Sequence, residues 1–127
     1  MRSVAFRCAI SLAVILAASC ATTQSRYSTL SEGYSSQPLS EDYKVEVFRS
    51  GNPQKPFVKI ARLDVHLEKT HFIGSNLDNA LPELVRQARL SGAQAIIDID
   101  ETNSRVGETM IYHVTATGIR YTDEIRK

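Results

Sequence analysis

The chain has 127 residues, enough for one small domain, with 15 Lys and Arg against 14 Asp and Glu. This near-neutral balance leaves no basic surplus of the kind that nucleic-acid binding or a polybasic membrane patch would need. Two cysteines are present, Cys8 and Cys20.

The first nineteen residues have the three-part pattern of a secretory signal. Arg2 and Arg7 form a basic start without acidic residues, an apolar run follows, and small residues precede Cys20. The apolar run is shorter than the roughly 20 residues that a helix needs to span a bilayer. An N-terminal anchor or a buried core helix would explain less well why basic residues are followed by an apolar run and then by small residues. We therefore predict that residues 1–19 are a signal peptide, cleaved between Ser19 and Cys20.

The residues Ala17-Ala18-Ser19-Cys20 resemble the lipobox of bacterial lipoproteins. This resemblance implies that Cys20 carries diacylglycerol on its sulfur and a further acyl chain, such as palmitate, on its new amino terminus. Because Ala21 is not Asp, the sorting rule of that family implies the outer membrane, with the folded part facing the periplasm. Several acyl chains anchor a protein stably, whereas a single chain holds it only marginally.

Cleavage would change the composition of the chain in one important way. Removing residues 1–19 from the 127 leaves 108 residues, with 13 Lys and Arg against 14 Asp and Glu. Cys8 would be lost and Cys20 would carry lipid, so no thiol would remain for a disulfide, a nucleophile or a metal. The stability of the mature domain would then come from its core alone.

Residues 20–41 are predicted to be the lipidated N-terminus and a flexible linker. Ser, Thr and Gln dominate this stretch, apolar residues are few, and no hydrophobic period is visible. Such a segment cannot bury enough surface to order itself, so it would hold the domain away from the membrane. A tail that binds peptidoglycan or a partner is the alternative interpretation.

Two strands are predicted next, over residues 43–47 and 57–68, because apolar and polar residues alternate in both. In the second strand Leu63, Val65 and Leu67 share one face, and charged or imidazole side chains occupy the other. This pattern is typical of a sheet with one packed face and one face in water.

A helix is predicted from just before Pro82, since proline is tolerated in the first turn, with Asp78 and Asn79 as N-cap candidates. Gly92 is placed as its C-cap. The apolar stripe has helical spacing and consists of Leu81, Leu84, Val85 and Ala88. The side facing water would carry Glu83, Arg86, Gln87 and Arg89.

The last two strands are predicted over residues 93–100 and 110–121, joined by the polar stretch 102–108. In the final strand the small Gly118 would let the helix approach closely. The resulting fold class is α+β with the order β-β-α-β-β, one helix packed on a small, mainly antiparallel sheet. The domain would span residues 42–122, and 123–127 would form a C-terminal tail that frays.

Residues 84–97 read LVRQARLSGAQAII, and the last strand continues through Ala116-Thr117-Gly118-Ile119. A helix that runs into Gly-Ala-x-Ala and two apolar residues, followed by a strand with a glycine, resembles the small envelope domains grouped around YbjQ-like proteins and the RcsF signalling domain. The resemblance implies a small α/β fold from about residue 43 to 121. YbjQ-like proteins form ring oligomers without an established chemistry, and the disulfides of RcsF-type sensors have no counterpart here.

The histidines give no recognisable metal motif. His66 and His71 are five residues apart, which is not a standard ligand spacing, and a three-histidine site would need His113 to lie beside them. We expect these side chains to lie at the surface or to pair with neighbours.

Asp98 and Asp100 are the candidates for a metal or ligand site. On a regular strand the two carboxylates would share one face, roughly 6–7 Å apart. Paired carboxylates can bind a hard cation or share acid–base work. A solvated strand face is the plainer interpretation. No residue is predicted to be catalytic, since neither a nucleophile turn nor a glycine-rich phosphate loop is present.

The sequence therefore predicts an outer-membrane-anchored periplasmic lipoprotein that acts without catalysis, as an interaction, assembly or envelope-maintenance module. Its expected partners are envelope proteins or further copies of itself, with no nucleic acid and no cofactor. The alternative is a ligand- or metal-binding module that uses the strand edge at Asp98 and Asp100.

Overall fold

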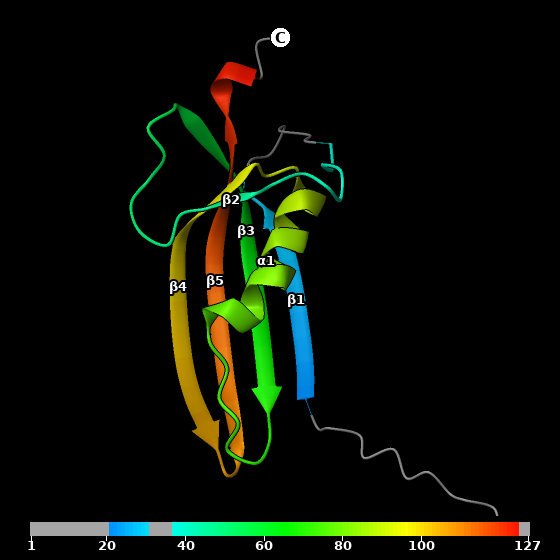
Figure 1. Cartoon of the computed structure of the whole chain (residues 1–127), viewed down its shortest axis with the longest axis vertical. Coiled ribbons are helices and arrows are strands. Elements are labelled where there is room, and N and C mark those ends of the chain that lie inside the picture. The colour runs from blue at the N-terminus through cyan, green and yellow to red at the C-terminus, as the bar shows by residue number, and fades with distance from the viewer. Residues whose placement is uncertain (1–20, 31–36, 125–127) are drawn as a thin grey trace, which may run out of the picture.

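The computed structural model describes residues 21–30 and 37–124, and in them a single helix packs on one face of a five-stranded sheet (Figure 1). The predicted signal peptide, Cys20 and residues 125–127 lie outside this description. The elements are β1 (Ala21–Thr29), β2 (Glu46–Val47), β3 (Phe57–Lys69), α1 (Leu77–Ser91), β4 (Ala95–Val106), β5 (Thr109–Tyr121) and the 3₁₀ turn η1 (Thr122–Glu124). None of the helices in this part of the chain combines the length and the apolar character needed to cross a membrane.

The strands lie in the order β1-β3-β5-β4-β2. All neighbours are antiparallel except β2 and β4, which run parallel over two residue pairs. The predicted α+β class and the strands over 57–68, 93–100 and 110–121 are confirmed. β4 is longer than predicted and reaches Val106, because the hairpin needs only the two residues Gly107 and Glu108. Gly107 has φ 61°, a conformation that such short hairpin turns require of their first residue.

The prediction of a flexible linker is wrong for residues 21–29, which form the edge strand β1. Every residue of β1 is paired with β3, from Ala21 opposite Lys69 to Thr29 opposite Ala61. The domain therefore includes residues 21–29 and does not begin at residue 42. The polar composition misled the prediction, because β1 is held by its backbone ladder and by polar side chains, with little apolar burial.

Ser25 joins β1 to the helix. Its hydroxyl donates to Glu83 at 2.5 Å and accepts from Gln87 at 2.8 Å and Arg86 at 3.1 Å. Gln87 is only 3% exposed, although the helical pattern placed it on the side facing water. Gln87 was misplaced because β1 was not predicted. This strand covers the flank of α1 that a four-stranded sheet would leave open.

The helix begins earlier than predicted, at Leu77. Asn76 is its N-cap and forms a capping box with Asn79, in which each side chain accepts a hydrogen bond from the other residue's backbone. Pro82 consequently lies inside the helix, at an exposed position, where its missing N–H leaves the fourth preceding carbonyl without a helical donor. The prediction of Gly92 as C-cap is confirmed by its left-handed conformation, φ 80° and ψ 14°.

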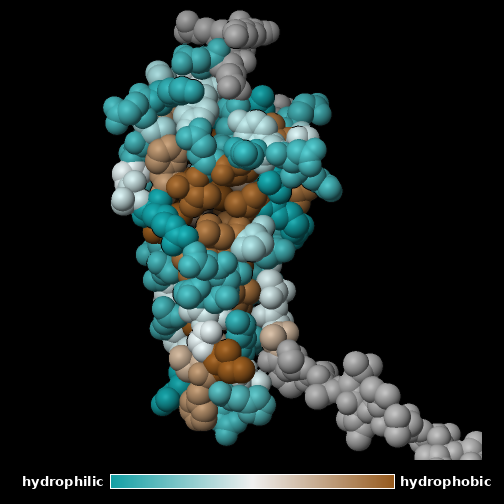
Figure 2. Space-filling view, viewed as in Figure 1, coloured by the Kyte–Doolittle hydropathy of each residue, from teal (hydrophilic) through white to brown (hydrophobic). Residues whose placement is uncertain are grey.

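The main core lies between α1 and the sheet. Buried apolar side chains from β3, α1, β4 and β5 fill it, with Leu63, Val65 and Val114 fully buried. Beside α1 this core reaches the surface, where Figure 2 shows apolar side chains; its partly buried border includes Val45, Val47, Leu81, Val85 and Ile99.

Gly118 lies where the end of α1 meets the sheet. A Cβ at this position would come within 2.8 Å of the Ala93 Cβ and 3.5 Å of the Ala61 Cβ. The predicted close approach at Gly118 is therefore confirmed. The residue that approaches it is Ala93, just after the C-cap, and not a residue of the helix itself. A second, smaller core on the opposite face consists of Ala95, Ile97, Ile119 and Tyr121, with Phe48 and Phe57 packed against it.

Candidate functional site

The face of the sheet opposite α1 is polar and open over β1, β3 and β5. Val65 on β3 is buried under α1, so its neighbours Asp64 and His66 point to the other face. Residues directly opposite in neighbouring strands share a face, which places Arg26 beside Asp64 and His113 beside His66. We call this surface the polar face; it is formed by Gln24, Arg26, Ser28, Arg62, Asp64, His66, Glu68 and His113.

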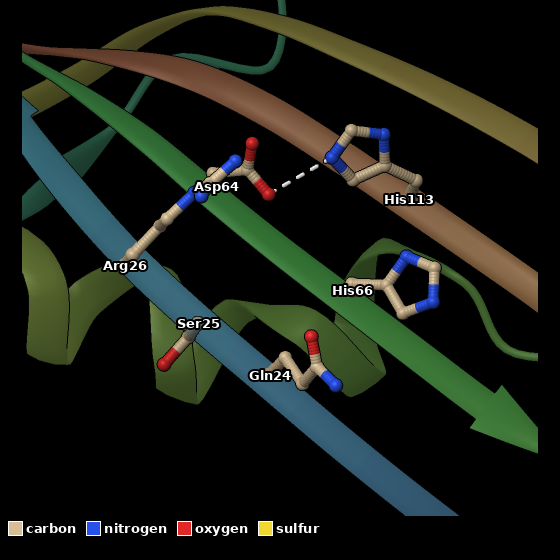
Figure 3. A pocket seen from close by; sticks show the side chains of 6 residues that line it. All are labelled: Gln24, Ser25, Arg26, Asp64, His66 and His113. Atoms are coloured by element: carbon tan, nitrogen blue, oxygen red, sulfur yellow. Dashed lines mark hydrogen bonds and ion pairs between the residues drawn. The ribbon is translucent and has the colours of Figure 1, made fainter.

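His66 and His113 form the centre of the polar face. Their ring centroids are 5.8 Å apart, and the rings are tilted by 57°. The Nε2 atom of His113 lies 2.9 Å from an oxygen of Asp64, the contact drawn in Figure 3. Nε2 of His66 lies 2.8 Å from an oxygen of Glu68. Each imidazole is thus held by a carboxylate of β3, and all four groups are partly exposed.

An open pocket of about 390 Å³ lies over these side chains and is lined by Gln24, Ser25, Arg26, Asp64, His66 and His113 (Figure 3). A smaller hollow of about 240 Å³ adjoins it, since Arg26 and Asp64 line both, and Ser28 and Arg62 complete it. Together the two hollows form a shallow trough along β1 and β3. Donors from two guanidinium groups and two imidazoles therefore lie close to acceptors from two carboxylates.

The trough has the character of a contact surface for polar groups. Within the described residues no group of three His, Cys, Asp or Glu side chains is placed to hold a metal ion. The hydroxyl of Ser25 makes its hydrogen bonds with α1, on the other side of the sheet from the histidine rings.

His71 is separate from the other two histidines. It lies in the β3–α1 loop with 79% of its side chain exposed, and its Nδ1 is 3.9 Å from a carboxylate oxygen of Glu108. The structure thus brings His113 beside His66 but leaves His71 elsewhere. The expectation that the histidines pair with neighbours is confirmed for His66 and His113.

The spacing predicted for Asp98 and Asp100 does not occur, because β4 has a bulge there. The pairing with β5 shifts between Ile97 and Asp100, and Asp98 has φ 51°. The extra residue breaks the regular alternation of side chains. Asp98 instead forms an ion pair of 2.8 Å with Lys59, and both side chains are about half exposed.

A third hollow, of about 320 Å³, lies near the beginning of α1 and is lined by Arg49, Asn76, Leu77, Asp78, Ile99 and Glu101. Next to it the hydroxyl of Tyr112 donates to Glu101 at 2.7 Å. Burial of the ring, together with this contact to a carboxylate, raises the pKa of Tyr112 well above its ordinary value of 10. The phenol therefore stays neutral and acts as a hydrogen-bond donor that positions the Glu101 side chain.

The polar face was not predicted as a site, although one signal for it was present. The alternation of β3 already placed Asp64, His66 and Glu68 on one face. What the sequence lacked was the register that puts His113 opposite His66, and the existence of β1, which supplies Gln24 and Arg26.

No protein-family model, curated protein or solved structure matches this chain.

Proposed function

We propose that this chain is a lipoprotein of the outer membrane that binds another protein of the envelope, without catalysis, through the polar face of its sheet. The single observation that carries the proposal is this uncovered face. α1 covers one side of the sheet, whereas polar side chains of three strands are presented together on the other side.

The chemistry of the trough suits a protein partner. Guanidinium, imidazole, amide and carboxylate groups alternate over a shallow surface, which provides many directional hydrogen bonds and little enclosed volume. Interfaces between proteins commonly combine such polar contacts with arginine side chains. Small-molecule sites, in contrast, are usually concave and mostly apolar.

The lipid anchor supports the same function. The predicted acylation of Cys20 would confine the domain to one membrane, where partners of the envelope are present at high effective concentration. The trough begins only a few residues after Cys20, at Gln24, so a lipid anchor at Cys20 would be joined almost directly to the strand that carries the contact surface.

The alternative site at Asp98 and Asp100 has less support. The bulge interrupts their alternation, and the Asp98 carboxylate is already bound by the Lys59 ammonium. A cation would have to displace that contact before it could bind there.

Site-specific photo-crosslinking in intact cells tests the proposal. A photoreactive amino acid replaces the exposed Arg62 on the polar face, or the exposed Pro82 on α1 as a matched control. We expect a crosslinked protein at position 62 that is absent at position 82, because only the first position lies in the trough. Mass spectrometry then identifies the partner as an envelope protein or a second copy.

The same experiment with Cys20→Ser tests the anchor. We expect this variant to leave the membrane fraction and to lose most of the crosslinked product. Equal crosslinking from positions 62 and 82, or none from either, would contradict the proposed contact surface. A Cys20→Ser variant that stays in the membrane fraction would refute the lipid anchor.

A further inference from the structure

The end of the sheet where β1 begins carries three exposed apolar side chains. Phe72 and Ile73 in the β3–α1 loop are 59% and 53% exposed, and Val106 at the end of β4 is 68% exposed. We call these three residues the apolar tip. Figure 2 shows apolar side chains at this lower end of the molecule, with polar side chains next to them.

The apolar tip is held in place by the fold. The backbone N–H of Phe72 donates to the carbonyl of Glu108 at 2.9 Å, which ties the loop to the β4–β5 hairpin. The guanidinium of Arg105 lies 5.8 Å from the centre of the Phe72 ring. His71 and Phe72 both have positive φ, 57° and 58°, a backbone conformation that is unfavourable for such residues. The fold thus maintains a strained loop that presents an aromatic side chain to solvent.

The predicted lipid site lies at the same end of the sheet. β1 begins at Ala21, whose partner is Lys69, and the loop to Phe72 starts directly after Lys69. One peptide bond joins Cys20 to Ala21, and consecutive Cα atoms are only about 3.8 Å apart. Acyl chains on Cys20 would therefore leave the protein beside the apolar tip, not at the end of a long linker.

We propose that the apolar tip rests in the interface of the lipid bilayer, so that the sheet stands directly on the membrane. The inference rests on the proposed acylation of Cys20 and adds an orientation to it. The acyl chains bring the tip to the membrane surface, and Phe72, Ile73 and Val106 then leave water for the headgroup region. Lys69 and Arg105, at the same end of the sheet, provide cations for lipid phosphates.

Tryptophan fluorescence in vesicles tests this orientation, because the chain contains no tryptophan of its own. The full chain is expressed with its own signal segment, purified from membranes and placed in phosphatidylcholine vesicles whose acyl chains carry bromine, a contact quencher. Phe72→Trp reports on the tip. Leu30→Trp is the matched control, since Leu30 is an apolar residue 51% exposed just beyond the other end of β1.

We expect brominated lipid to quench and blue-shift the emission of Phe72→Trp and to leave that of Leu30→Trp unchanged. Val106→Trp, at the other side of the tip, should behave like Phe72→Trp and keeps the test valid if one variant folds poorly. Equal emission from positions 72 and 30, whether both quenched or both unquenched, would overturn the inference. The mass of the N-terminal peptide distinguishes the two proposals. An acylated Cys20 with unquenched tryptophans at the tip would contradict only the proposed orientation. An unmodified Cys20 would contradict the proposed lipid anchor.

Discussion

At the scale of single residues, the junction between α1 and the sheet depends on the absence of one side chain. Gly118 on β5 faces the Cβ of Ala93, the residue that follows the C-cap of α1. Gly92 directs the chain to this point through its left-handed conformation. The two glycines therefore act together, one by turning the chain and the other by leaving room for it.

Gly118→Ala should destabilise the domain by about 1–3 kcal/mol, because the new Cβ would lie 2.8 Å from that of Ala93 and neither backbone can move freely. Gly74→Ala is the control, since nothing lies within 4 Å of a Cβ there and its φ is not positive. The control should change stability by less than about 0.5 kcal/mol. Urea unfolding of both variants measures the difference. Equal midpoints would show that the junction can adjust to a methyl group.

At the scale of elements, β1 shows how a strand can be added with little hydrophobic burial. Eight of its nine residues are exposed, and Ser25 is the exception. Its contacts with Glu83 and Gln87 replace the apolar packing that normally holds a strand under a helix. Apart from its backbone pairing with β3, β1 is therefore attached to the domain mainly through this one polar cluster.

Ser25→Ala should weaken this attachment by about 1–3 kcal/mol, because it leaves the buried Gln87 amide without its acceptor. The effect should also depend on pH. Hydrogen bonds from Arg86 and then Ser25 lower the pKa of Glu83 below its ordinary value of 4.5. A lowered folded-state pKa contributes stability above the unfolded value, and this contribution is lost as the pH falls through the folded value.

The loss caused by Ser25→Ala should consequently be larger at pH 7 than well below pH 4.5. Urea unfolding at the two pH values provides the comparison, and Ser28→Ala on the polar face of the same strand is the control. A penalty that is the same at both pH values would argue against a contribution from the ionised Glu83.

The elements differ in how far the sequence could predict them, for physical reasons. In β3 the burial of Leu63 and Val65 imposes a strict alternation of apolar and polar residues. The strand, and the side of it that carries polar residues, were therefore predictable. β1 has no such pattern, because its pairing uses backbone groups that every residue carries. The start of α1 was missed because Pro82 usually marks a first turn, which favoured Asp78 or Asn79 as the N-cap, whereas the capping box at Asn76 makes Leu77 the first helical residue.

At the scale of the whole molecule, stability is expected to decrease from the middle of the sheet to its edges. β3 and β5 each have strands on both sides, whereas β1 has a partner on one side and β2 contributes only two residue pairs. Both central strands also contribute fully buried side chains, Val65 and Val114 among them. β1 therefore combines an edge position with the weakest burial.

Amide hydrogen exchange of the full chain should reveal this order. We expect the hydrogen-bonded amides of β3 and β5 to exchange most slowly, by global unfolding, and those of β1 to exchange faster through local opening. Ser25→Ala should accelerate amide exchange in β1 through local opening. The amides of β5 should still exchange only when the whole domain unfolds. Protection in β1 equal to that in β5 would mean that the edge strand unfolds only with the whole domain.

The strand order also determines when the domain can fold during its synthesis. β5 follows all other strands in the chain, yet it lies in the middle of the sheet, between β3 and β4. Until residue 121 has emerged, β3 and β4 have no common partner, and Gly118 is not there to receive Ala93. The core therefore cannot close before β5 has been made, which is the behaviour that the proposed signal peptide would need in a chain exported before it folds.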